Sequence, residues 1–237
     1  ESSKEHASLL DSKDPLKNYR DLFFYPTHER IKNTIYLCGN SLGLQPKSVK
    51  NLLDKELEFW SRRGVLGQHE RWEKFHEDLA YPTSKLVGAK PSEVIIMNAL
   101  TVNLHLLLVS FYKPTKTRNK ILIERGAFPS DQYAIESQIR FHGYSPKQCL
   151  IEIKPREGES CIRIEDIQDK IKEFGSEIAT ILIGGVNYYT GQLMDMKTIT
   201  KYGKDVGAKV GFDLAHAIGN VDLHLNKWNV DFAVWCS

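Results

Sequence analysis

The chain lacks most of the short motifs that assign an enzyme class directly. It has no GxGxxG fingerprint, no GxxxxGK[ST] phosphate loop and no GxSxG elbow, and its histidines His69 and His76 do not fit the HExxH spacing. Dinucleotide, nucleotide triphosphate, serine hydrolase and zinc protease chemistry therefore lose their usual sequence support. No internal repeat or low-complexity segment stands out.

Cysteine is scarce, and long apolar runs are missing. The four cysteines lie far apart without a CxxC pair, at Cys38, Cys149, Cys161 and Cys236. We therefore expect reduced thiols rather than a disulfide framework or a zinc site. The polar residues 1–6 lack the apolar stretch of a signal peptide, and no apolar run approaches the ~20 residues of a membrane span. The sequence predicts a cytoplasmic protein without a membrane partner.

An excess of either charge is also absent. The 237 residues include 32 Lys and Arg against 30 Asp and Glu, which gives a net charge of +2, and neither sign forms a long block. A nucleic-acid surface usually needs a clustered basic stripe, so we expect no nucleic-acid partner. With 41% hydrophobic and 26% charged residues the composition is that of a soluble globular protein.

What the chain does contain is a regular alternation of strand and helix patterns from residue 90 onward. Apolar runs predict strands at 94–97, 120–124, 150–153, 178–183, 209–212 and 232–235. Helical patterns lie between most of them, at 101–112, 130–142, 164–174 and about 194–206. This alternation predicts a three-layer α/β/α fold with a mainly parallel sheet. We expect a helical N-terminal arm over 1–90 and an α/β domain over 91–237.

The most informative stretch is 211–217, where an acid and a base follow a strand. Asp213 and His216 stand where a parallel strand ends, and ligands of open α/β sheets bind just beyond that edge. A buried carboxylate needs a cationic partner, and a pyridinium nitrogen would serve. One alternative is that Asp213 caps the next helix. A metal pair is the other, but no third ligand is near, so we predict no metal site.

Three further segments follow strands in the same way. Thr101 opens an apolar helix whose free N–H groups attract phosphate, although a plain helix cap is the alternative. Phe128 can stack on a flat ring or belong to the core, while Ser130 and Asp131 suit a helix N-terminus. Gly184 begins a glycine-containing turn that permits close backbone approach.

Taken together and in order, these motifs resemble the kynureninase family, whose members are pyridoxal phosphate (PLP) enzymes of the aspartate-aminotransferase-like fold type I. The resemblance rests on the runs 37–47 (LCGNSLGLQPK), 97–105 (MNALTVNLH), 127–131 (AFPSD), 153–159 (IKPREGE), 189–192 (YTGQ) and 210–217 (VGFDLAHA). It covers nearly the whole chain beyond residue 20.

The resemblance implies a role for each matching residue. It implies that Asp213 pairs with the ring nitrogen of PLP, that Phe128 stacks on the ring and that His216 lies beside the cofactor. The other implied cofactor contacts are Leu100, Thr101, Pro129, Ser130, Asp131 and Gly184. Gly184 stands where several family members have serine, which removes one side-chain hydrogen bond. Asn40, Ser41 and His69 are implied on the substrate side.

The reaction that the resemblance implies is hydrolysis of L-kynurenine or 3-hydroxykynurenine. The products are anthranilate or 3-hydroxyanthranilate plus L-alanine, within tryptophan catabolism and NAD biosynthesis. The family forms a Schiff base through a lysine that we expect just beyond Ser237, so no residue present is predicted as catalytic. The resemblance also implies a homodimer. A non-catalytic relative and another fold type I enzyme, such as a cysteine desulfurase or aminotransferase, are the alternatives.

One expectation follows from the fold type rather than from the lysine. In this fold the strand after the lysine lies between the 94–97 and 232–235 strands. We therefore expect an unpaired edge on each of them, and such edges favour aggregation. These 237 residues by themselves are predicted to be inactive and poorly soluble.

Overall fold

The computed structural model describes residues 3–27, 29 and 34–236. The chain divides into two compact units, residues 1–73 and 74–237. They are treated one at a time below.

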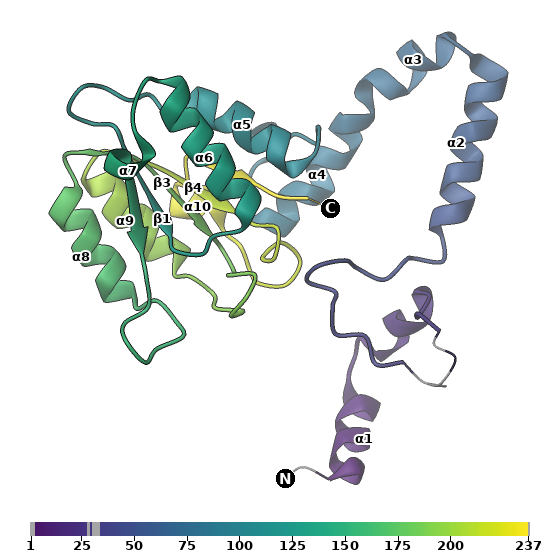
Figure 1. The fold of residues 1–237 in the computed structure, drawn as a ribbon. Coiled ribbons are helices and arrows are strands. Elements are labelled where there is room, and N and C mark those ends of the chain that lie inside the picture. The colour runs from purple at the N-terminus through teal and green to yellow at the C-terminus, as the bar shows by residue number, and fades with distance from the viewer. Residues whose placement is uncertain (1–2, 28, 30–33, 237) are drawn as a thin grey trace. The chain divides into compact units, whose positions relative to one another are not determined.

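The first unit is mainly helical. Its elements are α1 (Lys4–Lys13), the 3-10 helix η1 (Lys17–Leu22), α2 (Val49–Arg63) and α3 (Leu66–Glu70), with η2 (Trp72–Lys74) at its end (Figure 1). Apolar residues recur at helical spacing after Pro46, as at Val49, Leu53 and Leu57, and they lie in α2. An edge-to-face contact between Phe59 and Trp72, with ring centroids 5.7 Å apart, fastens α2 to the segment after α3. An ion pair of 2.6 Å between Arg71 and Glu56 supports the same junction.

The second unit is built on five parallel strands. They are β1 (Lys120–Glu124), β2 (Leu150–Ile153), β3 (Ile178–Gly184), β4 (Lys209–Asp213) and β5 (Phe232–Val234), in the order β2-β1-β3-β4-β5. Each neighbouring pair is parallel, as the alternation predicted. All carboxyl ends of the strands therefore meet at one edge of the sheet.

Helices cover both faces of this sheet. The helices of the unit are α4 (Phe75–Val87), η3 (Pro91–Glu93), α5 (Leu100–Phe111), α6 (Pro129–Phe141), α7 (Pro146–Cys149), α8 (Ile164–Phe174), α9 (Met196–Asp205) and α10 (Leu225–Trp228) (Figure 1). Strand residues alternate between two cores, because successive side chains point to opposite faces. Ile121 and Ile123 pack with α5 and α6, whereas Leu122 packs with α8 and α9. The three-layer fold type is thereby confirmed.

The predicted strand at 94–97 is wrong. These residues carry no strand pairing and run as irregular chain from η3 to the start of α5. β5 is the outermost strand, with only β4 hydrogen-bonded to it. A groove of about 830 Å³ is lined by 94–97, the outer side of β5 and one side of α5. An apolar strand sequence needs a hydrogen-bonding neighbour to become a strand, and no described segment supplies one to 94–97.

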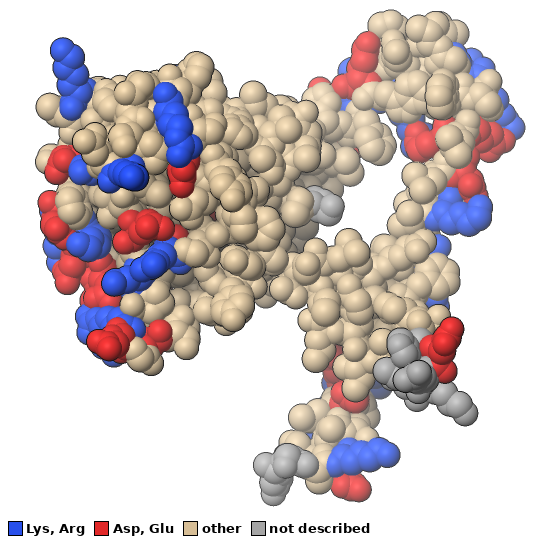
Figure 2. Space-filling model, viewed as in Figure 1, with Lys and Arg blue, Asp and Glu red and all other residues tan. Residues whose placement is uncertain are grey.

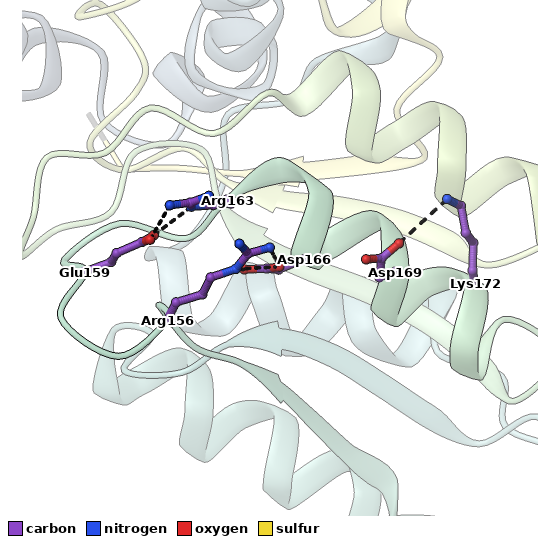
Figure 3. Close-up of polar contacts among 6 residues, drawn as sticks. All are labelled: Arg156, Glu159, Arg163, Asp166, Asp169 and Lys172. Carbon is purple, nitrogen blue, oxygen red and sulfur yellow. Dashed lines mark hydrogen bonds and ion pairs between the residues drawn. The ribbon is translucent and has the colours of Figure 1, made fainter.

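Charged side chains are unevenly spread over the second unit. In Figure 2 they gather on its left, over α8 and the segments around it, while uncharged atoms dominate its middle. Much of the charge is paired, as Figure 3 shows for the loop before α8: Arg156 binds Asp166, and Arg163 binds Glu159. Within the described residues, no helix has the length and apolar character needed to cross a membrane.

Candidate active site

Three carboxyl side chains come together at the carboxyl end of the sheet. Glu124 ends β1, Asp213 ends β4, and Asp131 lies in the first turn of α6. They are 3%, 8% and 5% exposed, and the side chains of Asp131 and Asp213 are hydrogen-bonded to each other. In the part of the chain that the structure describes, no lysine or arginine forms an ion pair with any of the three. This acid cluster (Glu124, Asp131 and Asp213) is therefore chemically suited to a cationic ligand.

Burial changes the protonation of the acid cluster, most clearly at Asp131. Burial, and then the neighbouring charge of Asp213, raises the pKa of Asp131 to about 8. Asp131 thus keeps its proton at neutral pH, and its carboxyl group is hydrogen-bonded to the side chain of Asp213. The backbone N–H of Ala215 donates to Asp213 Oδ1 at 2.7 Å. The Asp213 side chain therefore accepts one backbone hydrogen bond and shares another with Asp131.

The segment after β4 does not form the helix that the capping alternative required. Residues 215–220 are turns, and Asp213 accepts a hydrogen bond from the N–H two residues on. A capping role for a following helix is therefore wrong. His216 lies in the first of these turns, three residues from Asp213 and half-buried.

Phe128 lies at the same edge, just before α6. It is the N-cap residue of α6, followed by Pro129 at the first helical position, and the residue remains 46% exposed. The ring of Tyr188 meets it edge to face, with centroids 5.2 Å apart at 81°. An aromatic side chain of the core would be covered. Phe128 instead keeps much of its surface open, as a residue that contacts a flat ligand would.

Ser130 and Asp131 occupy the first turn of α6, as their types predicted. Ser130 Oγ lies 3.4 Å from Asp131 Oδ1. Pro129 donates no N–H group, so its place at the helix start costs no hydrogen bond.

The start of α5 provides free backbone donors. Its N-cap is Ala99, which has no side chain able to cap, so the alternative of Thr101 as a plain helix cap is wrong. Asn98 adopts a left-handed φ of 42° and turns the chain into the helix, while Asn103 Nδ2 donates to the carbonyl of Met97 at 2.6 Å. The N–H groups of Leu100 and Thr101 therefore begin the helix without a side-chain cap. Such a start attracts anions, phosphate included.

Gly184, at the end of β3, is bound to the acid cluster. Its N–H donates to Glu124 Oε1 at 3.1 Å and to Oε2 at 3.3 Å. A Cβ at this position would lie 3.0 Å from Glu124 Oε1. Glycine at this position therefore leaves room for the Glu124 carboxyl group against the end of β3.

The substrate-side predictions fall in the first unit. Asn40 and Ser41 are exposed in a turn, and His69 lies in α3 with Nδ1 2.8 Å from Glu73 Oε1. They do not belong to the unit that carries the acid cluster, and their substrate role stays a prediction.

Two residues of the site were not singled out from the sequence. Glu124 gave the same signal as Asp213, an acid directly after an apolar strand, but it was read only as part of that strand. Tyr188 gave no signal, because its contact with Phe128 joins segments 60 residues apart. In the described part of the chain, no group of three or more His, Cys, Asp and Glu has the arrangement of a metal site.

Comparison with known families identifies the class of the chain. The model of the aminotransferase class-V family matches residues 35–237. The chain belongs to this family. In an aminotransferase class-V chain, the edge that carries Asp213, Phe128 and the start of α5 is thus the expected ligand edge of the sheet.

Curated relatives match this chain over its full length. Kynureninase of Flavobacterium psychrophilum is 57% identical over 240 residues, covering 100% of this chain and 56% of that protein. Kynureninase of Nematostella vectensis is 50% identical and covers 99% of this chain and 54% of that protein. The chain spans about half the length of the curated relatives that it matches. The resemblance to the kynureninase family is confirmed.

Solved structures agree on the fold alone. Cysteine desulfurase of Thermococcus onnurineus superposes with a TM-score of 0.66 at 20% identity, over 96% of this chain and 52% of that one. A C-DES structure with glycine covalently linked to its PLP cofactor has a TM-score of 0.72 at 13% identity, over 86% and 52% of the two chains.

Proposed function

We propose that the full-length protein is a PLP-dependent kynureninase that hydrolyses L-kynurenine or 3-hydroxykynurenine to anthranilate or 3-hydroxyanthranilate and L-alanine. The observation that carries this proposal is identity of 50–57% with curated kynureninases along 98–100% of the chain. The fold by itself would not separate this activity from other class-V reactions.

The residues present fit the cofactor. An acid cluster without a lysine or arginine partner suits a protonated ring nitrogen, the half-exposed Phe128 suits the ring face, and the uncapped start of α5 suits the phosphate. When bound, PLP supplies an electron-withdrawing ring that stabilises negative charge on the substrate's carbon. This chain would hold the ring nitrogen with Asp213, the ring with Phe128, and the phosphate with Leu100 and Thr101.

The chain's own residues set up the charge for that role. Burial, and then the charge of Asp213, raises the pKa of Asp131 to about 8, so Asp131 keeps its proton at neutral pH and its carboxyl group is hydrogen-bonded to Asp213. The N–H of Ala215 fixes the orientation of the same carboxylate. Both contacts come from residues of the chain itself, and such preorganised polar groups lower the reorganisation needed when a cation binds.

Other parts of the proposal rest on the resemblance alone. Pro129, Ser130, Asp131, Gly184 and His216 complete the cofactor contacts. Asn40, Ser41 and His69 contact the substrate. The active form is a homodimer in the cytoplasm.

The test is a product assay on the full-length protein supplied with PLP. We expect anthranilate fluorescence from L-kynurenine, or 3-hydroxyanthranilate from 3-hydroxykynurenine, with one alanine formed per aromatic product. Bound PLP without turnover of either kynurenine would overturn the substrate assignment. A panel that includes cysteine and amino-group acceptors would then separate the desulfurase and aminotransferase alternatives from a non-catalytic protein.

A further inference from the structure

Glu124 is a buried acid that the proposed function does not use. It ends β1, is 3% exposed, and lies close enough to Asp213 and Asp131 to interact with both charges. Its two oxygens share the N–H of Gly184. A glutamate needed only to accept one N–H could be replaced by a neutral acceptor, so its ionisable group calls for an explanation.

We propose that Glu124 is a positioning residue for the cofactor: held by the Gly184 amide, its carboxyl group sets the charge of the acid cluster at which Asp213 meets the ring nitrogen. This inference rests on the proposed function, because it concerns the same cation. Glu124 would act through Asp213 and not by contact with the ring.

The surroundings of Glu124 define how it titrates. Asp213 faces it from β4 and Asp131 from α6, whereas its paired neighbour on β2 is Ile153 and its partner on β3 is the Gly184 amide, neither of which titrates. Burial, opposed by its backbone hydrogen bonds, raises the pKa of Glu124 to about 7. Without ligand the residue is therefore partly protonated at neutral pH.

A cation next to Asp213 changes that balance. The positive charge favours the ionised form of Glu124, so cofactor binding releases a proton from it. By linkage, the ionised form in turn strengthens the binding of the cation. Affinity for a ring with a protonated nitrogen should then rise with pH through the range in which Glu124 ionises.

The experiment compares the pH dependence of binding in the full-length wild type and Glu124→Gln. Gln keeps an oxygen for the Gly184 N–H but carries no charge. Pyridoxamine 5′-phosphate is the probe, since it has the ring nitrogen and phosphate but no aldehyde to react with lysines. Its dissociation constant is measured from pH 5.5 to 8.5 for both proteins. The ratio of the two dissociation constants is independent of the titration of the probe, because the probe titrates in the same way in both experiments.

We expect the wild type to gain about fivefold to tenfold in affinity over Glu124→Gln as the pH rises from 6 to 8. Glu124→Asp, which restores the charge, should recover part of this gain. Glu152→Gln is the matched control, because Glu152 is an exposed glutamate on the adjacent strand β2. It should leave the profile unchanged. A probe with carbon in place of the ring nitrogen should bind both proteins with the same profile.

A constant affinity ratio between wild type and Glu124→Gln across this pH range would overturn the inference and leave Glu124 a purely structural acceptor. The number of protons released on probe binding can be measured by calorimetry in buffers of different ionisation enthalpy. The same number for wild type and Glu124→Gln would overturn the inference without reference to affinity. Failure of the proposed function looks different. If the cofactor site is wrong, the wild type itself does not bind the probe and Asp213→Ala changes nothing; if only the substrate is wrong, the product assay fails while this pH profile remains.

Discussion

Both ends of the central sheet hold buried carboxyl side chains, but those at the amino end are paired with lysines and those at the carboxyl end have no lysine partner among the described residues. At the amino end, Asp231 precedes β5 and lies 2.7 Å from Lys204 Nζ and 3.1 Å from Lys209 Nζ, and it accepts the N–H of Val210 at 2.8 Å. Although burial opposes it, these hydrogen bonds and charges lower the pKa of Asp231. At the carboxyl end, Glu124 and Asp131 have raised pKa values instead.

The difference shows which end serves the fold and which end serves a ligand. Asp231 is ionised and neutralised by residues of its own unit, so it stabilises the junction of α9, β4 and β5. The acid cluster buries charge that no lysine or arginine of the described chain balances. Such an arrangement costs stability unless a cation from outside completes it.

The largest expected effect comes from Asp213→Ala. We expect PLP affinity to fall about 100-fold, because removing one partner of a buried ion pair costs roughly 3 kcal/mol. The unfolding free energy of the cofactor-free protein should stay unchanged or increase, since a buried charge is lost. Asp213→Asn is the control for shape. Unaltered PLP affinity in both variants would contradict the assignment of the cation site.

Asp231→Ala should show the opposite pattern. We expect a loss of about 2 kcal/mol in unfolding free energy, measured by urea denaturation, because the Val210 N–H and two lysines lose their partner. PLP affinity should not change. Asp231→Asn, which keeps an acceptor for the N–H, should lose less, and a variant as stable as the wild type would refute the structural role.

The pH dependence of the unfolding free energy should also differ between the acids at the two ends of the sheet. The folded pKa of Glu124 lies above its unfolded value of about 4.5, so its ionisation destabilises the folded state as pH rises from about 5 to 8. Glu124→Gln should therefore gain about 1–2 kcal/mol relative to wild type over that range, without cofactor.

The effect of pH on stability has the opposite sign at Asp231. Its folded pKa is depressed, so its contribution is present above the unfolded pKa and disappears as pH falls through the folded one. Wild type should converge with Asp231→Asn in acid. Parallel stability curves at all pH values would show that neither acid is coupled to folding.

The smallest effect is expected at the surface ion pairs drawn in Figure 3. Arg163→Ala removes the partner of Glu159 in the loop before α8, where the Arg163 side chain is 51% exposed and that of Glu159 is 30% exposed. Exposed pairs contribute little because water and salt screen them. We expect no measurable change in melting temperature or PLP affinity. A clear loss would mean that charge pairing in general, and not burial, distinguishes the two ends of the sheet.

The order of the elements was accessible from the sequence because each strand or helix carries its own periodicity. The patterns at 120–124 and 164–174 gave β1 and α8 with the same bounds as the structure. The strand predicted at 94–97 does not form, because an apolar, β-branched segment becomes a strand only when a neighbouring strand supplies hydrogen bonds. Asp213 was found because an acid after an apolar strand is rare, but Glu124, with the same signal, was passed over as an ordinary strand end.

The sequence by itself determined the alternation of strands and helices, the residues that end each strand and the likeness to kynureninases, because these are local or ordered along the chain. Only the tertiary structure decided that Glu124, Asp131 and Asp213 share one buried volume while Asp231 meets two lysines. Parallel strands bring Glu124 and Asp213, 89 positions apart in the sequence, to one edge of the sheet. Whether a buried acid holds or loses its proton depends on the groups that the fold places beside it.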